Sequence, residues 1–260
     1  MNLEVFYVDA FADKLFSGNP AAIIFTDLND EILMQKIAAE NNLSETAFIN
    51  MESDKNFIRW FSPTTEVNLC GHATLASAFV YFNYIDNSKS EILFHSASGN
   101  LKVTKKLDMY ELDFPKDNFH QIDAIETVFN VTGIKPIETY VGDINMLAVY
   151  EREEDIKLMK PDFQNLINLD GQGLIVTSAC NDFDFVSRYF CPKYGINEDP
   201  VTGSAHTTLI PYWSMRLNKS KLHAKQVSSR GGELFCKNLD KRVLIGGKAE
   251  LYMKGEVKIN

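Results

Sequence analysis

Four side chains in this sequence of 260 residues could carry out acid–base or nucleophilic chemistry. Glu45 begins an otherwise apolar segment, Asp199 precedes a proline, and Cys70 and His72 flank a glycine. A carboxylate or an imidazole within reach of a substrate can take up a proton and return it. A thiolate at the start of a helix can act as a base or as a nucleophile. The sequence therefore contains the groups that proton transfer requires.

The two halves of the chain repeat one pattern. Three blocks recur at offsets of 129, 132 and 133 residues: Arg59-Trp60-Phe61-Ser62-Pro63 as Arg188-Tyr189-Phe190-Cys191-Pro192, Gly71-His72-Ala73 as Gly203-Ser204-Ala205, and Gly99 as Gly232. An offset that stays near half the chain length implies a duplicated domain. A cleft between two similar lobes is a common place for a small-molecule site.

Positions at which the halves differ indicate where the two walls of that cleft carry different chemistry. At the same offsets, Glu45 matches Leu174, Asp199 matches Val67, His72 matches Ser204, and Cys70 matches Thr202. Glu198 matches Glu66, so we interpret this glutamate pair as structural. Simpler roles stay open: a solvent-facing Glu45, a turn-capping Asp199 and a packed Cys70 thiol.

Gly71 and Gly203 are each expected to begin a buried helix, running to Tyr84 and to about Leu217. The start of a helix offers free backbone N–H groups and a partial positive charge. Two such starts facing one cleft would bind a carboxylate or a developing oxyanion, although either could be an ordinary tight turn. Because the same positive charge disfavours an imidazolium, we expect His72 to be neutral.

The elements that position these residues are several strands around one helix in each half. We expect strands at 3–9, 20–25, 46–50, 56–61, 92–94, 99–104 and 109–114, a helix from Asn29 or Asp30 to about Asn41, and later strands at 173–178, 184–190, 226–228, 234–236 and 243–245. Pro211 should kink the second buried helix. Turn-forming and charged residues near Pro115 predict a seam between an N-terminal lobe, 1–115, and a C-terminal lobe, 116–260.

The overall composition excludes several classes of partner. The net charge is −9 and no run of Lys or Arg forms a patch, so we expect neither nucleic acid nor an anionic membrane as a partner. No apolar stretch reaches about 18 residues, so we expect no membrane span. The four cysteines are widely spaced without a CxxC pair, which predicts no zinc site, no disulfide framework and a cytoplasmic protein.

Four linked segments closely resemble the PhzF family of phenazine-biosynthesis-like proteins: Gly18-Asn19-Pro20-Ala21-Ala22, Leu43-Ser44-Glu45-Thr46-Ala47-Phe48, Leu69-Cys70-Gly71-His72-Ala73-Thr74, and the segment from Glu198 to His206. The resemblance covers essentially the whole chain. It implies the α+β fold of diaminopimelate epimerase, with two pseudo-symmetric lobes. Each lobe would be a mostly antiparallel, barrel-like sheet wrapped around a central buried helix, with the site between the lobes.

The resemblance also implies an activity, the isomerisation of a dihydro-hydroxyanthranilate by proton transfer without metal or cofactor. Carried over by motif, Glu45 resembles the acid/base, and Asp199 and His72 resemble partners that orient the substrate. The expected substrate-binding residues are Gly71, Gly203, Ser204, Ser44 and Asn19. We therefore expect a cofactor-independent isomerase that moves a proton between carbons of a small, cyclic carboxylate. A homodimer is compatible with the resemblance.

Cys70 is a departure from the PhzF motif and resembles the related epimerases and racemases, in which a cysteine precedes this glycine. One alternative is therefore a one-cysteine epimerase or dehydratase acting at an amino-acid α-carbon, with Cys70 as the base. A two-base racemase would lack its second base, because Thr202 stands at the matching position. The other alternative is a non-catalytic small-molecule binder on the same scaffold.

Overall fold

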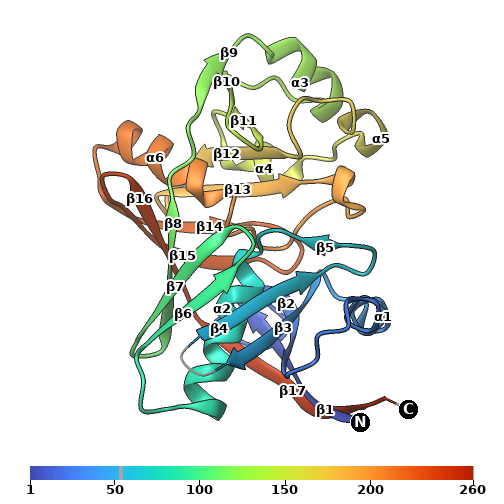
Figure 1. Ribbon diagram of the computed structural model, residues 1–260. Coiled ribbons are helices and arrows are strands. Elements are labelled where there is room, and N and C mark those ends of the chain that lie inside the picture. The colour runs from blue at the N-terminus through green and yellow to red at the C-terminus, as the bar shows by residue number, and fades with distance from the viewer. Residues whose placement is uncertain (53–54, 260) are drawn as a thin grey trace. The chain divides into compact units, whose positions relative to one another are not determined.

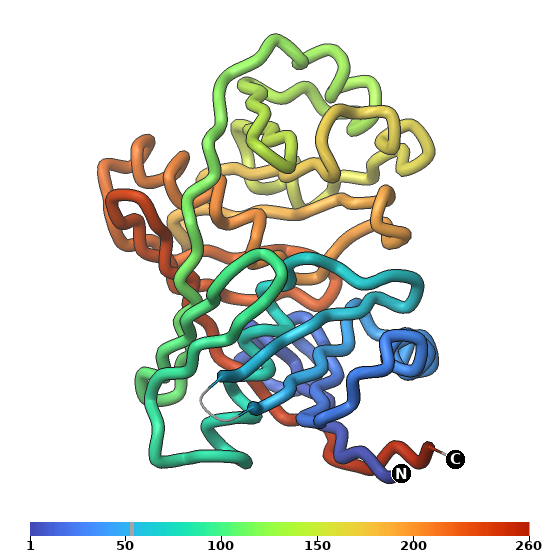
Figure 2. The backbone as a smooth tube through the Cα atoms, in the orientation of Figure 1, coloured from blue at the N-terminus to red at the C-terminus, as the bar shows by residue number. Residues whose placement is uncertain are grey.

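The computed structural model describes residues 1–52 and 55–259, which form two compact units. The first unit comprises Met1–Asp113 and Gly246–Asn260, and the second comprises Phe114–Ile245. The expected seam lies within two residues of this division, but the expected C-terminal lobe differs because the last strand returns to the first unit. That strand, β17 (Ala249–Lys258), pairs antiparallel with β1 (Asn2–Ala10) along its length. The two chain ends therefore lie side by side (Figure 2).

The first unit is a sheet that surrounds one buried helix, α2 (Gly71–Val80) (Figure 1). Its other strands are β2 (Asn19–Phe25), β3 (Glu45–Glu52), β4 (Lys55–Phe61), β5 (Glu66–Val67), β6 (Glu91–Ser96), β7 (Gly99–Lys106) and β8 (Met109–Pro115). β1 pairs antiparallel with β2, β2 parallel with β3, β3 antiparallel with β4, and β4 parallel with β6. This arrangement confirms the expected strands of the first half.

Local sequence explains both helices of this unit. Helix α1 (Glu31–Asn41) begins at Asp30, whose side chain accepts a hydrogen bond from the Leu33 N–H at 3.1 Å, and it ends at the left-handed Asn42. Helix α2 is apolar on every side, and all its residues except Phe79 are buried. A π-helical turn, Tyr81–Ile85, continues it toward the expected end at Tyr84. The sheet thus holds the start of α2 in a fixed place.

The second unit contains a mixed sheet with helices. Its elements are β9 (His120–Ile122), α3 (Ile125–Thr132), β10 (Glu138–Val141), β11 (Met146–Val149), α4 (Glu153–Leu158), α5 (Phe163–Leu166), β12 (Leu174–Ala179), β13 (Phe185–Phe190), the 3₁₀ turn Pro192–Tyr194, α6 (His206–Leu217), β14 (Lys221–Gln226), β15 (Gly232–Asn238) and β16 (Arg242–Gly247), which extends past the unit boundary. Helices α3, α4 and α5 contribute to one apolar core, and α6 packs against β14 and β15.

The order of strand pairing in the second unit matches that of the first. β11 runs parallel to β12, β12 antiparallel to β13, β13 parallel to β14, and β14 antiparallel to β15. The same four relations hold for β2, β3, β4, β6 and β7. This agreement supports the duplication that we infer from the echoed sequence blocks.

Several expectations for the second half were wrong or incomplete. The expected strand at 226–228 instead ends at Gln226, and the sequence did not indicate β9, β10, β11, α3, α4 or α5. Helix α6 begins at His206 rather than at Gly203, because Gly203 and Ser204 form a tight turn. In that turn the N–H of His206 donates to the Gly203 carbonyl at 3.0 Å, and the N–H of Thr207 donates to the Ser204 carbonyl at 3.1 Å.

Helix α6 continues through Pro211, at which we expected a kink. Proline has no N–H, so the Thr207 carbonyl loses its usual partner four residues later. The backbone N–H of Asp117 donates to this carbonyl instead, at 3.3 Å. The Asp117 carboxylate also accepts a hydrogen bond from the Thr208 hydroxyl at 2.5 Å. The residue just after the predicted seam therefore stabilises the proline-containing turn.

The echoed arginine and glutamate residues form the same ion pair in each unit, which agrees with the structural interpretation of Glu66 and Glu198. Arg59 makes two hydrogen bonds to Glu66, at 2.7 and 2.6 Å, and Arg188 makes two to Glu198, at 2.7 and 2.8 Å. Each guanidinium also lies over a phenylalanine ring two residues later in its strand. Each pair anchors the segment just before a candidate site residue, namely Cys70 in the first unit and Asp199 in the second.

Replacing Arg188 with methionine is expected to cost more stability than replacing Arg59. The side chains of Arg188 and Glu198 are 12% and 19% exposed, against 30% and 33% for Arg59 and Glu66. Breaking the more buried pair should lower the free energy of unfolding by about 3–5 kcal/mol. Breaking the half-exposed pair should cost about 1 kcal/mol. Urea unfolding of both variants measures the difference, and equal losses would contradict this interpretation.

Candidate active site

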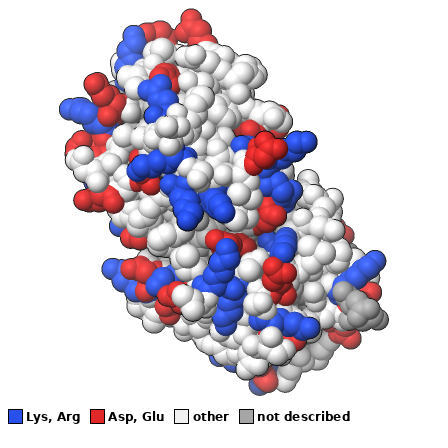
Figure 3. Space-filling view, turned by 90° about the vertical axis from the view of Figure 1, so that its left-hand side faces the viewer, with Lys and Arg blue, Asp and Glu red and all other residues white. Residues whose placement is uncertain are grey.

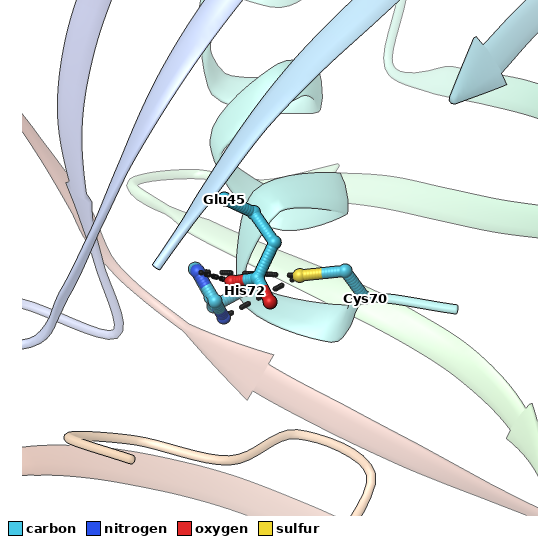
Figure 4. A group of neighbouring side chains, drawn as sticks. All are labelled: Glu45, Cys70 and His72. Carbon is cyan, nitrogen blue, oxygen red and sulfur yellow. Dashed lines mark hydrogen bonds and ion pairs between the residues drawn. The ribbon is translucent and has the colours of Figure 1, made fainter. Parts of the chain in front are cut away.

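Glu45, Cys70 and His72 meet at the start of α2 in the first unit (Figure 4). Glu45 is the first residue of β3, His72 is the second residue of α2, and Cys70 immediately precedes that helix. The Glu45 Oε2 and His72 Nε2 atoms lie 3.1 Å apart as an ion pair. The Cys70 Sγ atom lies 3.5 Å from His72 Nδ1 and 4.0 Å from Nε2. A carboxylate, an imidazole and a thiol therefore share one small volume.

The trio is largely buried, with Glu45 its most exposed member. The Glu45 side chain is 18% exposed and the His72 side chain is 5% exposed, while Cys70 is 6% exposed. A substrate or ion arriving from solvent would therefore meet the glutamate most readily. Ser44, which precedes Glu45, is partly exposed.

Asn19 extends this group on the far side of the imidazole. Its side-chain amide lies 3.1 Å from His72 Nδ1, and the residue is fully buried. Gly18 makes the turn before it with φ +69°, and a Cβ atom there would collide with the Ala10 carbonyl oxygen. Asn19 begins β2, which runs parallel to β3 with Ala21 opposite Glu45. Neighbouring strands thus place Asn19 and Glu45 around His72.

The expectation of a neutral His72 was wrong. Burial by itself lowers the pKa of His72, but Cys70 and the carboxylate of Glu45 beside the ring raise the pKa well above its ordinary value. The helix dipole is a weaker influence than a carboxylate 3.1 Å away. Burial and the charge of Glu45 also raise the pKa of the Cys70 thiol to about 11. At neutral pH Cys70 is therefore a protonated thiol, and Glu45 favours the protonated form of His72.

Asp199 belongs to the second unit and lies in a buried hydrogen-bonded group. The Thr202 hydroxyl donates to Asp199 Oδ2 at 2.6 Å. Gln226, at the end of β14, accepts from the Thr202 N–H at 2.9 Å and donates to the Asp199 carbonyl at 2.8 Å. Asp199 is 9% exposed and Gln226 is 1% exposed. Thr202 and Gln226 therefore hold the shape of the segment that carries Asp199.

The expected site residues are distributed over both units. Glu45, Cys70, His72, Gly71 and Asn19 lie together in the first unit, where Ser44 precedes Glu45, whereas Asp199, Gly203 and Ser204 lie within one short segment of the second. Sequence reasoning missed Gln226, although a buried glutamine is an unusual residue within a strand. It also treated Thr202 only as the counterpart of Cys70, and the structure shows it bound to Asp199.

His206 begins α6 and is fully buried. Its Nδ1 atom lies 2.8 Å from the Thr202 carbonyl, which can only accept, so Nδ1 carries the proton. Burial lowers the pKa of His206 to about 4. The neutral ring is thus part of the structure that supports the Asp199 segment.

We expect His206 to make the fold less stable in mild acid. The unfolded histidine binds a proton below a pKa of about 6.5 and the folded one only below about 4, so stability falls as the pH drops between these values. The loss attributable to His206 should approach about 3 kcal/mol. Urea unfolding from pH 7 to pH 4 should show a shallower decline in His206→Gln than in the wild type. An identical decline in both proteins would contradict the expectation.

Charged side chains of both signs are intermixed on the face of the molecule shown in Figure 3. Within residues 1–52 and 55–259, no helix combines the length and the apolar composition that a membrane span requires. All four cysteines are free thiols.

The described residues also contain one group of potential metal ligands, namely Glu45, Cys70 and His72, whose ligand atoms lie within 4.8 Å of one another.

Comparison with known proteins identifies the family. The sequence profile of the PhzC-PhzF family, described as phenazine biosynthesis-like protein, matches residues 8–255. The chain belongs to this family. An uncharacterised isomerase of Pseudomonas aeruginosa is 45% identical over 262 residues, with both proteins covered completely. The crystal structure of a PhzF-family phenazine biosynthesis protein from Enterococcus faecalis superposes with a TM-score of 0.97 at 48% identity, again over 100% of both chains.

A more distant structure shares the fold alone. A hydroxyproline epimerase from Agrobacterium vitis has a TM-score of 0.64 at 9% identity and covers 98% of this chain and 92% of its own. These findings confirm the family, the α+β epimerase-like fold and the enzyme class expected from the sequence. The chain is an isomerase of the PhzF family.

Proposed function

We propose that this PhzF-family isomerase moves a proton between two carbons of a small, cyclic carboxylate, with Glu45 as the acid/base and no cofactor. The observation that carries the proposal is the ion pair of 3.1 Å between Glu45 and His72 at the start of α2. It holds a carboxylate beside the free N–H groups of a helix start, where negative charge is stabilised. One carboxylate can remove a proton from one carbon and return it to another on the same bound ring.

Each neighbouring group has a distinct role in this proposal. The Glu45 carboxylate takes a proton from the substrate carbon. The electron pair left on that carbon is delocalised into the conjugated carboxylate group of the substrate. Backbone N–H groups near Gly71 stabilise that negative charge. His72 orients Glu45, and Asn19 fixes the imidazole ring by its contact at 3.1 Å. The protonated Glu45 then returns the proton to the second carbon, which completes the isomerisation.

We further propose that Asp199, Gly203, Ser204 and Ser44 are substrate-binding residues. The buried Thr202–Asp199 hydrogen bond supports this role, because it presents a charged group from a segment of fixed shape. A homodimer and a cytoplasmic location remain predictions; the four free thiols support the latter.

The test is a screen of cyclic and α-amino carboxylates. A ligand that binds the native fold raises the unfolding temperature when it is present in excess. Those ligands would then be incubated with the enzyme in deuterated water, and hydrogen exchange at carbon would be followed by NMR. Exchange into a cyclic carboxylate supports the proposal. Binding without exchange of any ligand would favour the alternative of a non-catalytic binder.

Replacing Cys70 with serine distinguishes the proposal from the one-cysteine epimerase or dehydratase. The high pKa of about 11 keeps this thiol protonated at neutral pH, and it therefore makes a poor base. We expect Cys70→Ser to retain turnover within about tenfold of the wild type, since general-base loss typically costs about 10²-fold or more. A loss as large as that of Glu45→Gln, measured on the same substrate, would identify Cys70 as the base.

A further inference from the structure

We propose that Glu45, Cys70 and His72 form a binding site for a zinc-like divalent cation, and that an ion bound there switches the enzyme off. The three residues offer a carboxylate oxygen, a sulfur and an imidazole nitrogen, all within 4.8 Å of one another. Zinc takes these three kinds of ligand, commonly with water in the fourth position of a tetrahedron. The spacing of the cysteines along the sequence does not reveal such a site, because only the fold brings the ligands together.

The distances lie within about 0.5 Å of those around a tetrahedral zinc ion. With zinc bonds of about 2.0 Å to nitrogen and oxygen and about 2.3 Å to sulfur, neighbouring ligand atoms lie about 3.3–3.6 Å apart. Here the His72 Nε2 and Glu45 Oε2 atoms are 3.1 Å apart, and the Cys70 Sγ atom is 4.0 Å from the same nitrogen. Side-chain movements of about 0.5 Å, well within ordinary thermal displacement, would therefore bring the three atoms around one ion.

Asn19 is placed to hold the His72 ring by a hydrogen bond to the nitrogen that does not bind the ion. A histidine that binds a metal through one ring nitrogen usually donates the N–H of the other nitrogen to a fixed oxygen. The Asn19 amide lies 3.1 Å from Nδ1, and rotation of the amide by half a turn places its oxygen there. Glu45, with 18% of its side chain exposed, offers the ligand that an incoming ion reaches first. The ion would then replace the thiol proton of Cys70 and the Nε2 proton of His72, and both protons pass to the solvent.

An ion bound to these three residues would occupy Glu45, which is the proton acceptor of the proposed reaction. Glu45 cannot take a proton from carbon while its oxygen is bound to zinc, and the ion would also pull His72 away from its ion pair with Glu45. The loss of turnover thus rests on the proposed function, whereas metal binding does not. Binding can be measured without any substrate, so failure of one idea can be told apart from failure of the other.

The experiment titrates the full-length reduced protein with Co²⁺, which reports a thiolate ligand by a charge-transfer band in the near ultraviolet. We expect one equivalent to bind with this band, and Zn²⁺ to displace it. In Cys70→Ser the band should vanish, and Zn²⁺ affinity measured by competition with a chelating dye should fall on the order of 10²-fold or more, since even outer partners cost 10–100-fold. Asn19→Ala should weaken binding by about 10–100-fold.

A cysteine elsewhere serves as the matched control. Cys180 in the second unit also lies beside a carboxylate, 2.8 Å from Glu153, but it belongs to no such three-ligand group among the described residues. Cys180→Ser should therefore keep the band and the affinity of the wild type. A band that persists in Cys70→Ser, or no band in the wild type, would overturn the site. A wild type that binds Zn²⁺ with full turnover would overturn the switch alone.

Discussion

Glu45→Gln is expected to lower turnover by about 10²-fold or more while substrate binding survives. Glutamine preserves the size of the side chain and keeps an oxygen beside His72 Nε2, but it has no basic oxygen. Exchange of substrate C–H hydrogen with deuterated water should vanish in the same variant. Turnover, the substrate dissociation constant and the exchange rate, all measured on the carboxylate found in the screen, together test the assignment.

The control for this substitution lies at the other end of the same strand. Glu52 is the last residue of β3 and is exposed, and it accepts a hydrogen bond from the side chain of Asn50 at 2.8 Å. Glu52→Gln removes one carboxylate charge from the same strand without touching His72. It should leave turnover and exchange unchanged. A Glu45→Gln variant that exchanges hydrogen as fast as Glu52→Gln would show that another group is the base.

Much of the first unit could be predicted from the sequence because its signals are local. Alternating strands, the Asp30 cap of α1 and the wholly apolar α2 each depend on residues close together in the chain. The echo between the halves added long-range information, and it marked Glu66 and Glu198 as structural, which agrees with the ion pair that each forms with an arginine. The motif residues of the first unit, Glu45 and His72, indeed lie together.

The remainder depends on contacts that the sequence does not display. Residues 117–170 have no readable counterpart in the first half, so β9 to β11 and α3 to α5 were missed. Gln226 reaches Asp199 and Thr202 from a strand more than twenty residues away. The expectation of a neutral His72 was wrong because the start of a helix can be recognised in the sequence, whereas the distance of 3.1 Å between His72 and Glu45 cannot.

Asp199→Asn is expected to damage both binding and rate, in contrast to Glu45→Gln. The amide oxygen of asparagine can still accept the Thr202 hydroxyl, and Gln226 still holds the backbone of the segment, so the local fold should persist. What is lost is the negative charge that we assign to orienting the substrate. We expect kcat/KM to fall on the order of 10²-fold, with the loss divided between a higher KM and a lower kcat.

The comparison of the two variants decides which carboxylate is the base. Asp182→Asn, at an exposed position of the second unit, controls for the change in net charge and should behave as the wild type. Thermal unfolding should show that Asp199→Asn remains folded, so that its kinetic loss reflects the site. If Glu45 is the base, hydrogen exchange stops in Glu45→Gln and continues, more slowly, in Asp199→Asn at saturating substrate. The reverse result would move the base to Asp199 and leave Glu45 as the residue that orients the substrate.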